Sequence, residues 1–152
     1  MDLRNWVRKR KGDFLERIVV SSSPPGGLDS LVDYRFARCS HFTVVDVEDG
    51  KIINVSVVPN QSAMVPHGAG IQAAQVIASL RAQVVITGNV GPNAFSSLQS
   101  LGVKIYAGVG GIKVKDAIMK YLSGSLSPAS GPGAFGRGMG RGMGRGRKGR
   151  GF

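Results

Sequence analysis

The second half of the chain alternates short apolar strands with helical segments, and this pattern limits the possible folds more than any other feature. The first predicted helix has its apolar residues on one face, the second begins near a proline, and the third is closed by a glycine. Alternation of this kind is typical of a sheet covered by helices. The predicted helices span residues 71–80, 92–101 and 113–122, and the predicted strands span residues 84–86 and 103–106.

The first half of the chain predicts strands instead. Two runs rich in β-branched residues, 41–47 and 52–58, flank an acidic turn that contains Asp49-Gly50. Two such runs around an Asp-Gly pair predict a β-hairpin. A shorter apolar run, Ile18–Val20, predicts a strand before the hairpin. A hairpin followed by strand and helix units implies a mixed sheet with helices on its faces.

Positive charge is concentrated at the two ends of the chain. The first seventeen residues contain six basic and three acidic residues, the next 113 contain eight and six, and the last 22 contain six and none. Ten of those last 22 residues are glycine, so the segment has little apolar surface to bury. The sequence therefore predicts a basic lead-in over 1–16, one globular domain over 17–126 and a disordered Gly/Arg-rich basic tail over 127–152.

The expected location is the cytoplasm. The single cysteine, Cys39, excludes an internal disulfide framework. The apolar run Ile18–Val20 is too short for the core of a signal peptide, and no run of about eighteen apolar residues is present for a membrane span. We therefore expect no contact with a membrane.

Four loops rich in glycine, serine or proline should meet at one edge of the sheet, where parallel strands end and ligands bind. Glycines let backbone N–H groups approach an anion at a helix N-terminus, so these loops favour a negatively charged ligand. Tight strand endings are the alternative explanation for any one of them. The loops span residues 21–27, 67–70, 88–92 and 108–111.

The same loops do not fit common catalytic motifs. Residues 68–73 match a dinucleotide-binding pattern, but no acidic residue lies between Asp49 and Asp116 to bind a ribose. No phosphate-binding loop of the nucleotide hydrolase type is present, and the predicted strands carry no carboxylate cluster for two-metal nuclease chemistry. The residues favour binding without turnover, so we do not expect an enzyme.

Cys39, His41 and His67 are soft or borderline metal ligands. One cysteine and two histidines are too few for a closed structural site, but they could serve an open site or one shared between two chains. In the alternative interpretation, Cys39 packs as a small buried residue and His67 forms hydrogen bonds within its loop.

Several motifs, taken in order, resemble a single family. The chain is similar to the dinitrogenase iron-molybdenum cofactor-binding proteins over roughly residues 17–126. In the nitrogenase carriers of that family a histidine precedes a Phe-Gly pair, whereas this chain has Arg35 at that position and Ala37 in place of the glycine. The motifs that carry the resemblance are Asp33–Phe42, Val58–Asn60, His67–Gly70, Val85–Ala94 and Tyr121–Leu126.

The resemblance implies a ribonuclease H-like three-layer α/β/α fold with a five-stranded mixed sheet. It also implies non-catalytic binding and delivery of a metal-sulfur cluster, iron-molybdenum-like or iron-sulfur, which a monomer or homodimer exchanges with a cluster donor or acceptor protein. Cys39 and His67 would be the metal ligands, and Arg35 and Arg38 would balance the charge of the cluster. The cluster would also contact backbone at Gly68, Gly70, Gly91, Gly110 and Gly111.

A second function stays open from the sequence alone. The tail, residues 131–152, could give weak, sequence-independent binding to nucleic acid or to another anionic surface, because its six basic residues face no acidic neighbour. The two hypotheses differ in where the ligand binds. The first uses the folded domain and the second uses the tail.

Overall fold

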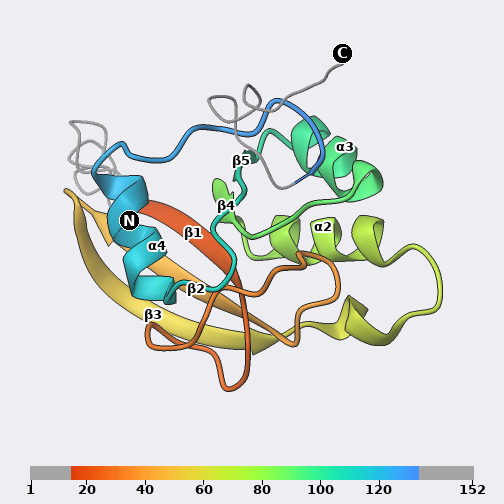
Figure 1. Cartoon of the computed structure of the whole chain (residues 1–152), viewed down its shortest axis with the longest axis horizontal. Coiled ribbons are helices and arrows are strands. Elements are labelled where there is room, and N and C mark those ends of the chain that lie inside the picture. Colours follow the sequence, from red (N-terminus) through yellow and green to blue (C-terminus); the bar gives the residue numbers. More distant parts are fainter. Residues whose placement is uncertain (1–14, 134–152) are drawn as a thin grey trace, which may run out of the picture.

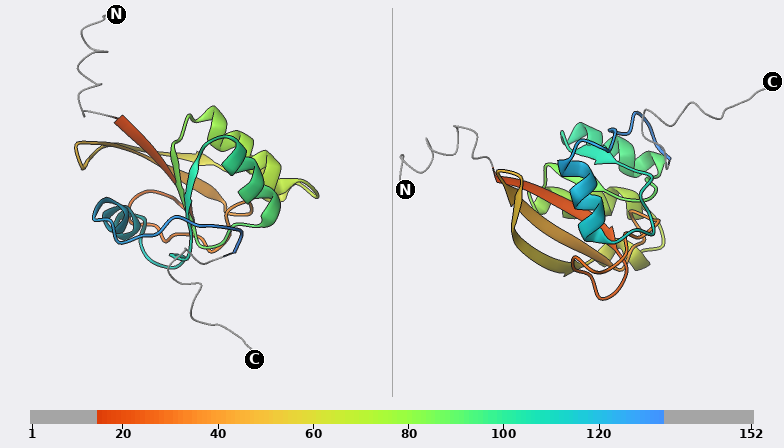
Figure 2. Two further views of the ribbon diagram at one scale, coloured as in Figure 1. Left: turned by 90° about the horizontal axis from the view of Figure 1, so that it is seen from above. Right: turned by 60° about the vertical axis from the view of Figure 1, so that its left-hand side comes forward.

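The computed structural model describes residues 15–133, which form a five-stranded mixed sheet with helices on both of its faces (Figures 1 and 2). The strands lie in the order β3-β2-β1-β4-β5. The strands are β1 (Leu15–Ser22), β2 (His41–Glu48), β3 (Lys51–Pro59), β4 (Val84–Ile86) and β5 (Lys104–Tyr106), and the helices are η1 (Gln61–Met64), α2 (Ala69–Ser79), α3 (Pro92–Ser100) and α4 (Val114–Leu122).

The predicted hairpin and the mixed sheet are confirmed. β2 and β3 pair antiparallel around Asp49 and Gly50, which both have positive φ. β1 pairs antiparallel with β2 on one side and parallel with β4 on the other, and β4 pairs parallel with β5. The central strand therefore joins an antiparallel half of the sheet to a parallel half.

Two apolar layers hold the helices on the sheet. α2 and α3 cover one face, where Ile77 and Leu98 pack in a cluster with Val19 of β1. α4 covers the other face, where Ile118 packs in a second cluster with Val20. Successive residues of a strand point to opposite faces, so β1 contributes to both layers and is buried on each side.

β1 begins at Leu15, before the apolar run that predicted it and inside the expected lead-in. The first residues of β1 include Glu16 and Arg17, and both charged side chains form hydrogen bonds with residues far along the chain. The Arg17 guanidinium donates from Nε to Asp46 Oδ1 at 2.7 Å and from Nη2 to Oδ2 at 3.0 Å. Tyr121 of α4 donates its hydroxyl to the Glu16 carboxylate at 3.0 Å. These long-range partners extend the strand beyond what local hydrophobicity predicts.

After α4 the chain returns along the edge of β5 towards α3 (blue in Figure 1). Ala129 packs against the apolar cluster beneath α2 and α3, and its N–H donates to the Ile105 carbonyl at 2.7 Å. Gly133 forms a two-hydrogen-bond bridge with Val90. The domain therefore continues past residue 126, where the sequence analysis placed its end. Most of the predicted lead-in and tail, residues 1–14 and 134–152, lies outside the described residues.

No helix among residues 15–133 has the length and apolar composition needed to cross a bilayer.

Candidate functional site

The ends of β1, β3, β4 and β5 lie at one edge of the sheet, which we call the carboxyl edge. β4 and β5 run parallel to β1, and β3 runs in the same direction because both it and β1 are antiparallel to β2. The connections that follow these four strands therefore start at the same edge. This is where an open α/β sheet binds its ligands.

The segment between β1 and β2 crosses the middle of this edge. The Phe36 N–H donates to the Asn89 carbonyl at 3.0 Å, and Gly88 N–H donates to the Asp33 carbonyl at 3.2 Å. Arg35 and Asn89 form a parallel bridge. The segment is thus joined like a short strand to the loop after β4.

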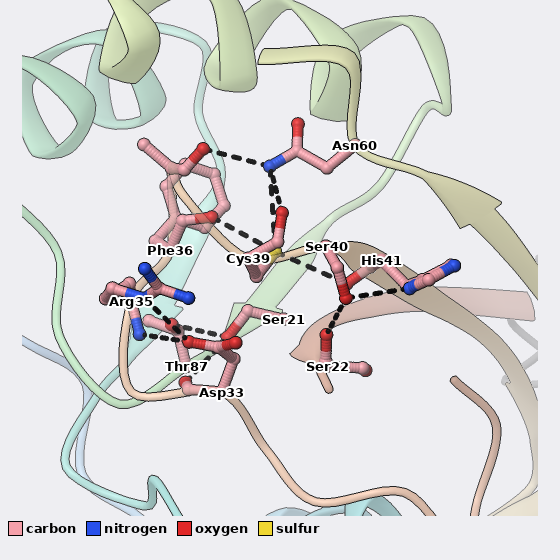
Figure 3. A network of polar contacts seen from close by, with 11 residues as sticks. Ser21, Ser22, Asp33, Arg35, Phe36, Cys39, Ser40, His41, Asn60 and Thr87 are labelled. Atoms are coloured by element: carbon pink, nitrogen blue, oxygen red, sulfur yellow. Dashed lines mark hydrogen bonds and ion pairs between the residues drawn. The ribbon is translucent and has the colours of Figure 1, made fainter. Parts of the chain in front are cut away.

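Asn60 fixes the other end of the segment (Figure 3). Its Nδ2 donates to the Ala37 carbonyl at 2.9 Å and to the Cys39 carbonyl at 2.8 Å, while its Oδ1 accepts from the Ser62 N–H at 3.0 Å. A buried amide that satisfies several groups at once is costly to replace. In the sequence Asn60 belongs to a motif of the family resemblance, with no role assigned to it. Its signal was an asparagine placed immediately before a short helix, where it caps the first turn.

Cys39 is fully buried, against Phe36 and Phe42 in the cluster beneath α2 and α3. Its thiol donates to the carbonyls of Phe36 and His41, each at 3.3 Å. Burial is the main cause that raises the pKa of the Cys39 thiol to about 12. Because metals bind the thiolate, this environment favours the packing interpretation in the folded state. Metal binding by Cys39 stays a prediction, and it would require the segment to open.

Arg35 and Arg38 are both exposed on the carboxyl edge. The Arg35 Nε lies 3.3 Å from Asp33 Oδ1, in an ion pair that solvent weakens. Arg38 donates from Nη1 to the carbonyls of Ala63 and Val65, at 3.0 and 2.7 Å. The two guanidinium groups therefore point to opposite ends of the edge, one beside the β4 loop and one beside η1.

Tyr34 lies over the glycine loop that follows β5. A Cβ atom at Gly110 or Gly111 would overlap the Tyr34 ring, and one at Gly88 would lie 2.6 Å from the Tyr34 Cα. Close packing against the Tyr34 ring and backbone thus explains these glycines. Tyr34 as a residue is 66% exposed, so it adds an aromatic surface to the carboxyl edge.

The N-termini of α2 and α3 lie side by side at this edge. A Cβ atom at Gly70 would come within 3.0 Å of the Ala94 backbone nitrogen, so the first turns of the two helices are in contact. Gly68 and Gly91 occupy the two N-cap positions, and neither helix has a side-chain hydrogen bond at its cap. The first N–H groups of a helix attract anions, and here those of α2 lie beside the first turn of α3, whose first residue, Pro92, has no N–H.

His67 is exposed immediately before α2. Met64, three residues earlier at the end of η1, is 89% exposed and offers a thioether, which is a soft donor that the sequence analysis overlooked. Among residues 15–133, no three His, Cys, Asp or Glu side chains are grouped closely enough to hold a metal ion.

The loop after β1 departs from the expected convergence. Ser21 is at the edge, where its Oγ shares a 2.7 Å hydrogen bond with Thr87 Oγ1 (Figure 3). Beyond it the chain turns over the hairpin, because Gly27 N–H donates to Thr43 Oγ1 at 3.0 Å and Gly26 packs against Val57. The prediction that the whole loop over residues 21–27 meets the other three loops at the carboxyl edge is wrong. Because β1 pairs antiparallel with β2, the loop between them folds back over β2 and β3.

Comparisons with a family model, with solved structures and with curated proteins each found proteins similar to this chain. Residues 17–124 match the family model described as dinitrogenase iron-molybdenum cofactor. The apo form of the orange protein from Desulfovibrio gigas is 42% identical, with a TM-score of 0.72 over 79% of this chain and 98% of that chain. A Thermotoga protein solved by NMR is 36% identical, with a TM-score of 0.64 over 80% of this chain and 97% of that chain. An uncharacterized protein of Methanocaldococcus jannaschii is 32% identical over 91 residues, which are 60% of this chain and 76% of that one.

Proposed function

Because this chain belongs to the dinitrogenase iron-molybdenum cofactor family, we propose that it binds a metal-sulfur cluster at the carboxyl edge and exchanges it with a donor or acceptor protein. The cluster, iron-molybdenum-like or iron-sulfur, is cargo and undergoes no reaction there. The observation that carries the proposal is the contact between the N-termini of α2 and α3, with Arg35 and Arg38 on either side of the same edge.

Anion binding is the chemistry that this edge supports best. Metal-sulfur clusters carry net negative charge, and paired helix N-termini and guanidinium groups stabilise such charge. His67 is the exposed imidazole beside α2 and is the more accessible of the two expected metal ligands. Cys39 would bind only after the segment that Asn60 holds has opened.

Binding without turnover is part of the proposal. An activated nucleophile needs a lowered pKa or an adjacent base, whereas burial raises the pKa of the Cys39 thiol to about 12. From the family we also infer that the fold is of the ribonuclease H-like type, and that the protein acts as a monomer or homodimer in the cytoplasm.

The test is an anaerobic titration of the full chain with tetrathiomolybdate, a coloured dianion of molybdenum and sulfide, and with a soluble iron-sulfur cluster. We expect Arg35→Gln and Arg38→Gln each to weaken binding about threefold to tenfold, since each removes a charge-assisted contact. His67→Ala should also weaken binding if the imidazole is a ligand. The matched control is Arg81→Gln, because Arg81 is exposed in the turn after α2, at the opposite edge of the sheet.

Two results would contradict the proposal. If the full chain binds neither probe, the carboxyl edge does not hold metal-sulfur species. If Arg81→Gln weakens binding as much as Arg35→Gln does, the effect comes from net charge and the site lies elsewhere.

The second candidate function, binding of nucleic acid through the tail, rests on the six basic and no acidic residues in 131–152. If all six neutralised phosphates of a single strand, the log-log slope of affinity against salt would be roughly −4. Single-stranded RNA should then bind the full chain and not a chain that ends at Gly133. Equal binding by both chains would place the contact on the domain.

A further inference from the structure

β3 forms an open edge of the sheet. It is the last strand in the order β3-β2-β1-β4-β5, and Figure 1 shows it as the outermost strand (yellow). Its strand partner is β2, and the N–H and C=O groups on its outer side have no sheet partner among residues 15–133. Such groups can pair with a further strand.

The features that usually block edge pairing lie only near the ends of β3. Natural edge strands are protected by charged residues, prolines or bulges. Lys51 is the first residue of β3 and Pro59 is the last, and the stretch between them carries no charge. A β-bulge bends the strand at Ile53, and the register with β2 is regular from Asn54 onward. The middle of the strand is therefore unprotected.

The exposed apolar side chains of β3 are placed symmetrically. Ile53 is 52% exposed and Val57 is 38% exposed, and they lie two residues before and two residues after Val55. Because alternate residues of a strand share a face, these three side chains form a row on one face, with Asn54 and Ser56 on the other. The row lies on the α4 side of the sheet, since Val55 pairs with a β2 residue in the cluster beneath α4.

This pattern is complementary to itself. When a strand pairs antiparallel with its own copy across a twofold axis, the residue on the axis faces itself, and residues equally far from it face each other. With Val55 on the axis, Ile53 of one copy faces Val57 of the other, and no like charges meet along the strand. Apolar cross-strand pairs stabilise a sheet, whereas like charges directly opposite destabilise it. A strand from an unrelated protein would not require this symmetry.

We propose that two copies of this chain pair through β3, antiparallel and centred on Val55, so that the five strands of each copy join in one continuous sheet. This inference goes beyond the proposed function and does not depend on it. β3 ends at the carboxyl edge, so antiparallel pairing directs the two carboxyl edges in opposite directions and leaves both open. A single strand pair is smaller than a standard interface, so the dimer dissociates readily.

The test is sedimentation equilibrium of the full chain between about 10 µM and 1 mM, where a small interface should show its association. We expect the average mass to rise from that of one chain towards that of two. I53K/V57K replaces both apolar pairs by pairs of like charge and should raise the dissociation constant about tenfold or more. The control I71K/L101K adds the same charge at two exposed apolar residues of the α2 and α3 layer, and it should dimerise as the unchanged chain does.

Opposite charges test the register. In I53E/V57K the carboxylate introduced at position 53 faces the ammonium group introduced at position 57 of the other copy. I53E/V55K has the same net charge but places two ammonium groups together on the axis. We expect I53E/V57K to dimerise at least about threefold more tightly than I53E/V55K at low salt. Thermal unfolding of each variant checks that the domain is folded.

Three results would overturn the proposal. The first is a full chain that stays monomeric at about 1 mM, because β3 is then covered by something other than a second copy. The second is equal weakening in I53K/V57K and I71K/L101K, which would show that net charge and not β3 governs the association. The third is equal affinity of I53E/V57K and I53E/V55K, which would exclude the register centred on Val55. Failure to bind tetrathiomolybdate would overturn the proposed function and leave this inference in place.

Discussion

Cys39 is buried away from solvent, and its thiol donates a hydrogen bond to the Phe36 carbonyl. Burial raises the pKa of the thiol and keeps it protonated. The sequence allowed two interpretations of this residue, a soft ligand or a packing residue. What separates them is burial by α2 and α3, which depends on contacts between elements distant in the sequence. Accessibility of Cys39 therefore measures how readily the segment at residues 33–39 opens.

Alkylation tests this directly. At pH 8 the folded chain should react with iodoacetamide at least about a hundredfold more slowly than the chain unfolded in denaturant, because a pKa of about 12 leaves very little thiolate. Mass spectrometry of timed samples gives both rates. Similar rates would show that the segment opens easily, and Cys39 would then be available as a ligand.

Asp46 gives a prediction about acid. The hydrogen bond from Arg17 is the main cause that lowers the pKa of Asp46, so the stabilisation is complete above the unfolded pKa of about 4 and is lost as pH falls through the folded value. Asp46→Asn should lower the free energy of unfolding by about 1–3 kcal/mol at pH 7. This difference should shrink below about pH 4.

Urea unfolding between pH 7 and pH 3 measures the effect. The control is Asp29→Asn, because the Asp29 side chain is 82% exposed and its ion pair with Lys115 contributes little. If the free energy of unfolding of Asp46→Asn stays as far below that of the unchanged chain at pH 3 as at pH 7, the cause is the lost geometry of the pair and not its charge.

At the scale of elements, the close approach between Tyr34 and the glycine loops defines how the 33–39 segment sits on the sheet. A Cβ atom at Gly88 would meet the Tyr34 backbone, which cannot move without displacing the segment. A Cβ atom at Gly110 would meet only the exposed Tyr34 ring, which can rotate away. The two glycines therefore look alike in sequence but carry different constraints.

Gly88→Ala should lower the free energy of unfolding by about 2–4 kcal/mol, while Gly110→Ala should cost under about 1 kcal/mol. Chemical denaturation of both variants provides the comparison. Equal costs would mean that the Tyr34 ring is as rigid as its backbone.

Local signals predicted most of these elements. The hairpin, β4 and the three α-helices each have a turn, a proline or a periodic apolar face within a few residues, and they lie where the sequence analysis placed them. The first residues of β1 were missed because Glu16 and Arg17 depend on partners far along the chain. Arg35, Arg38, His67 and the N-termini of α2 and α3 were expected at the site from the sequence, and their role in binding stays a prediction. Tyr34 and Asn60 lie within motifs of the family resemblance, but their contacts with Gly88 and with the Cys39 carbonyl join residues far apart in the sequence and could not be predicted. Met64 was missed.

At the scale of the whole molecule, the segment after α4 decides where the domain ends. The composition of residues 127–133 is typical of a tail, yet Ala129 and Gly133 form hydrogen bonds with β5 and the β4 loop. Hydrogen bonding to the exposed edge of β5 therefore orders residues that their composition would assign to a tail.

Two truncations test this boundary. A chain that ends at Gly133 should keep its melting temperature within a few degrees, whereas a chain that ends at Ser127 should melt at least about 5 °C lower, since it loses Ala129 from the core and the bridge to Val90. Calorimetry of the two chains decides between them. Identical melting temperatures would show that the return segment contributes nothing to stability.

The position of β1 at the centre of the sheet has a consequence for synthesis on the ribosome. The hairpin can pair as soon as Pro59 has emerged, because its contacts are local. The carboxyl edge cannot form then, since Ser21 must wait for Thr87, sixty-six residues later, and Val90 for Gly133. A nascent chain therefore has no completed carboxyl edge until nearly all of the domain has been translated, so the proposed cluster site forms only after Gly133 has emerged.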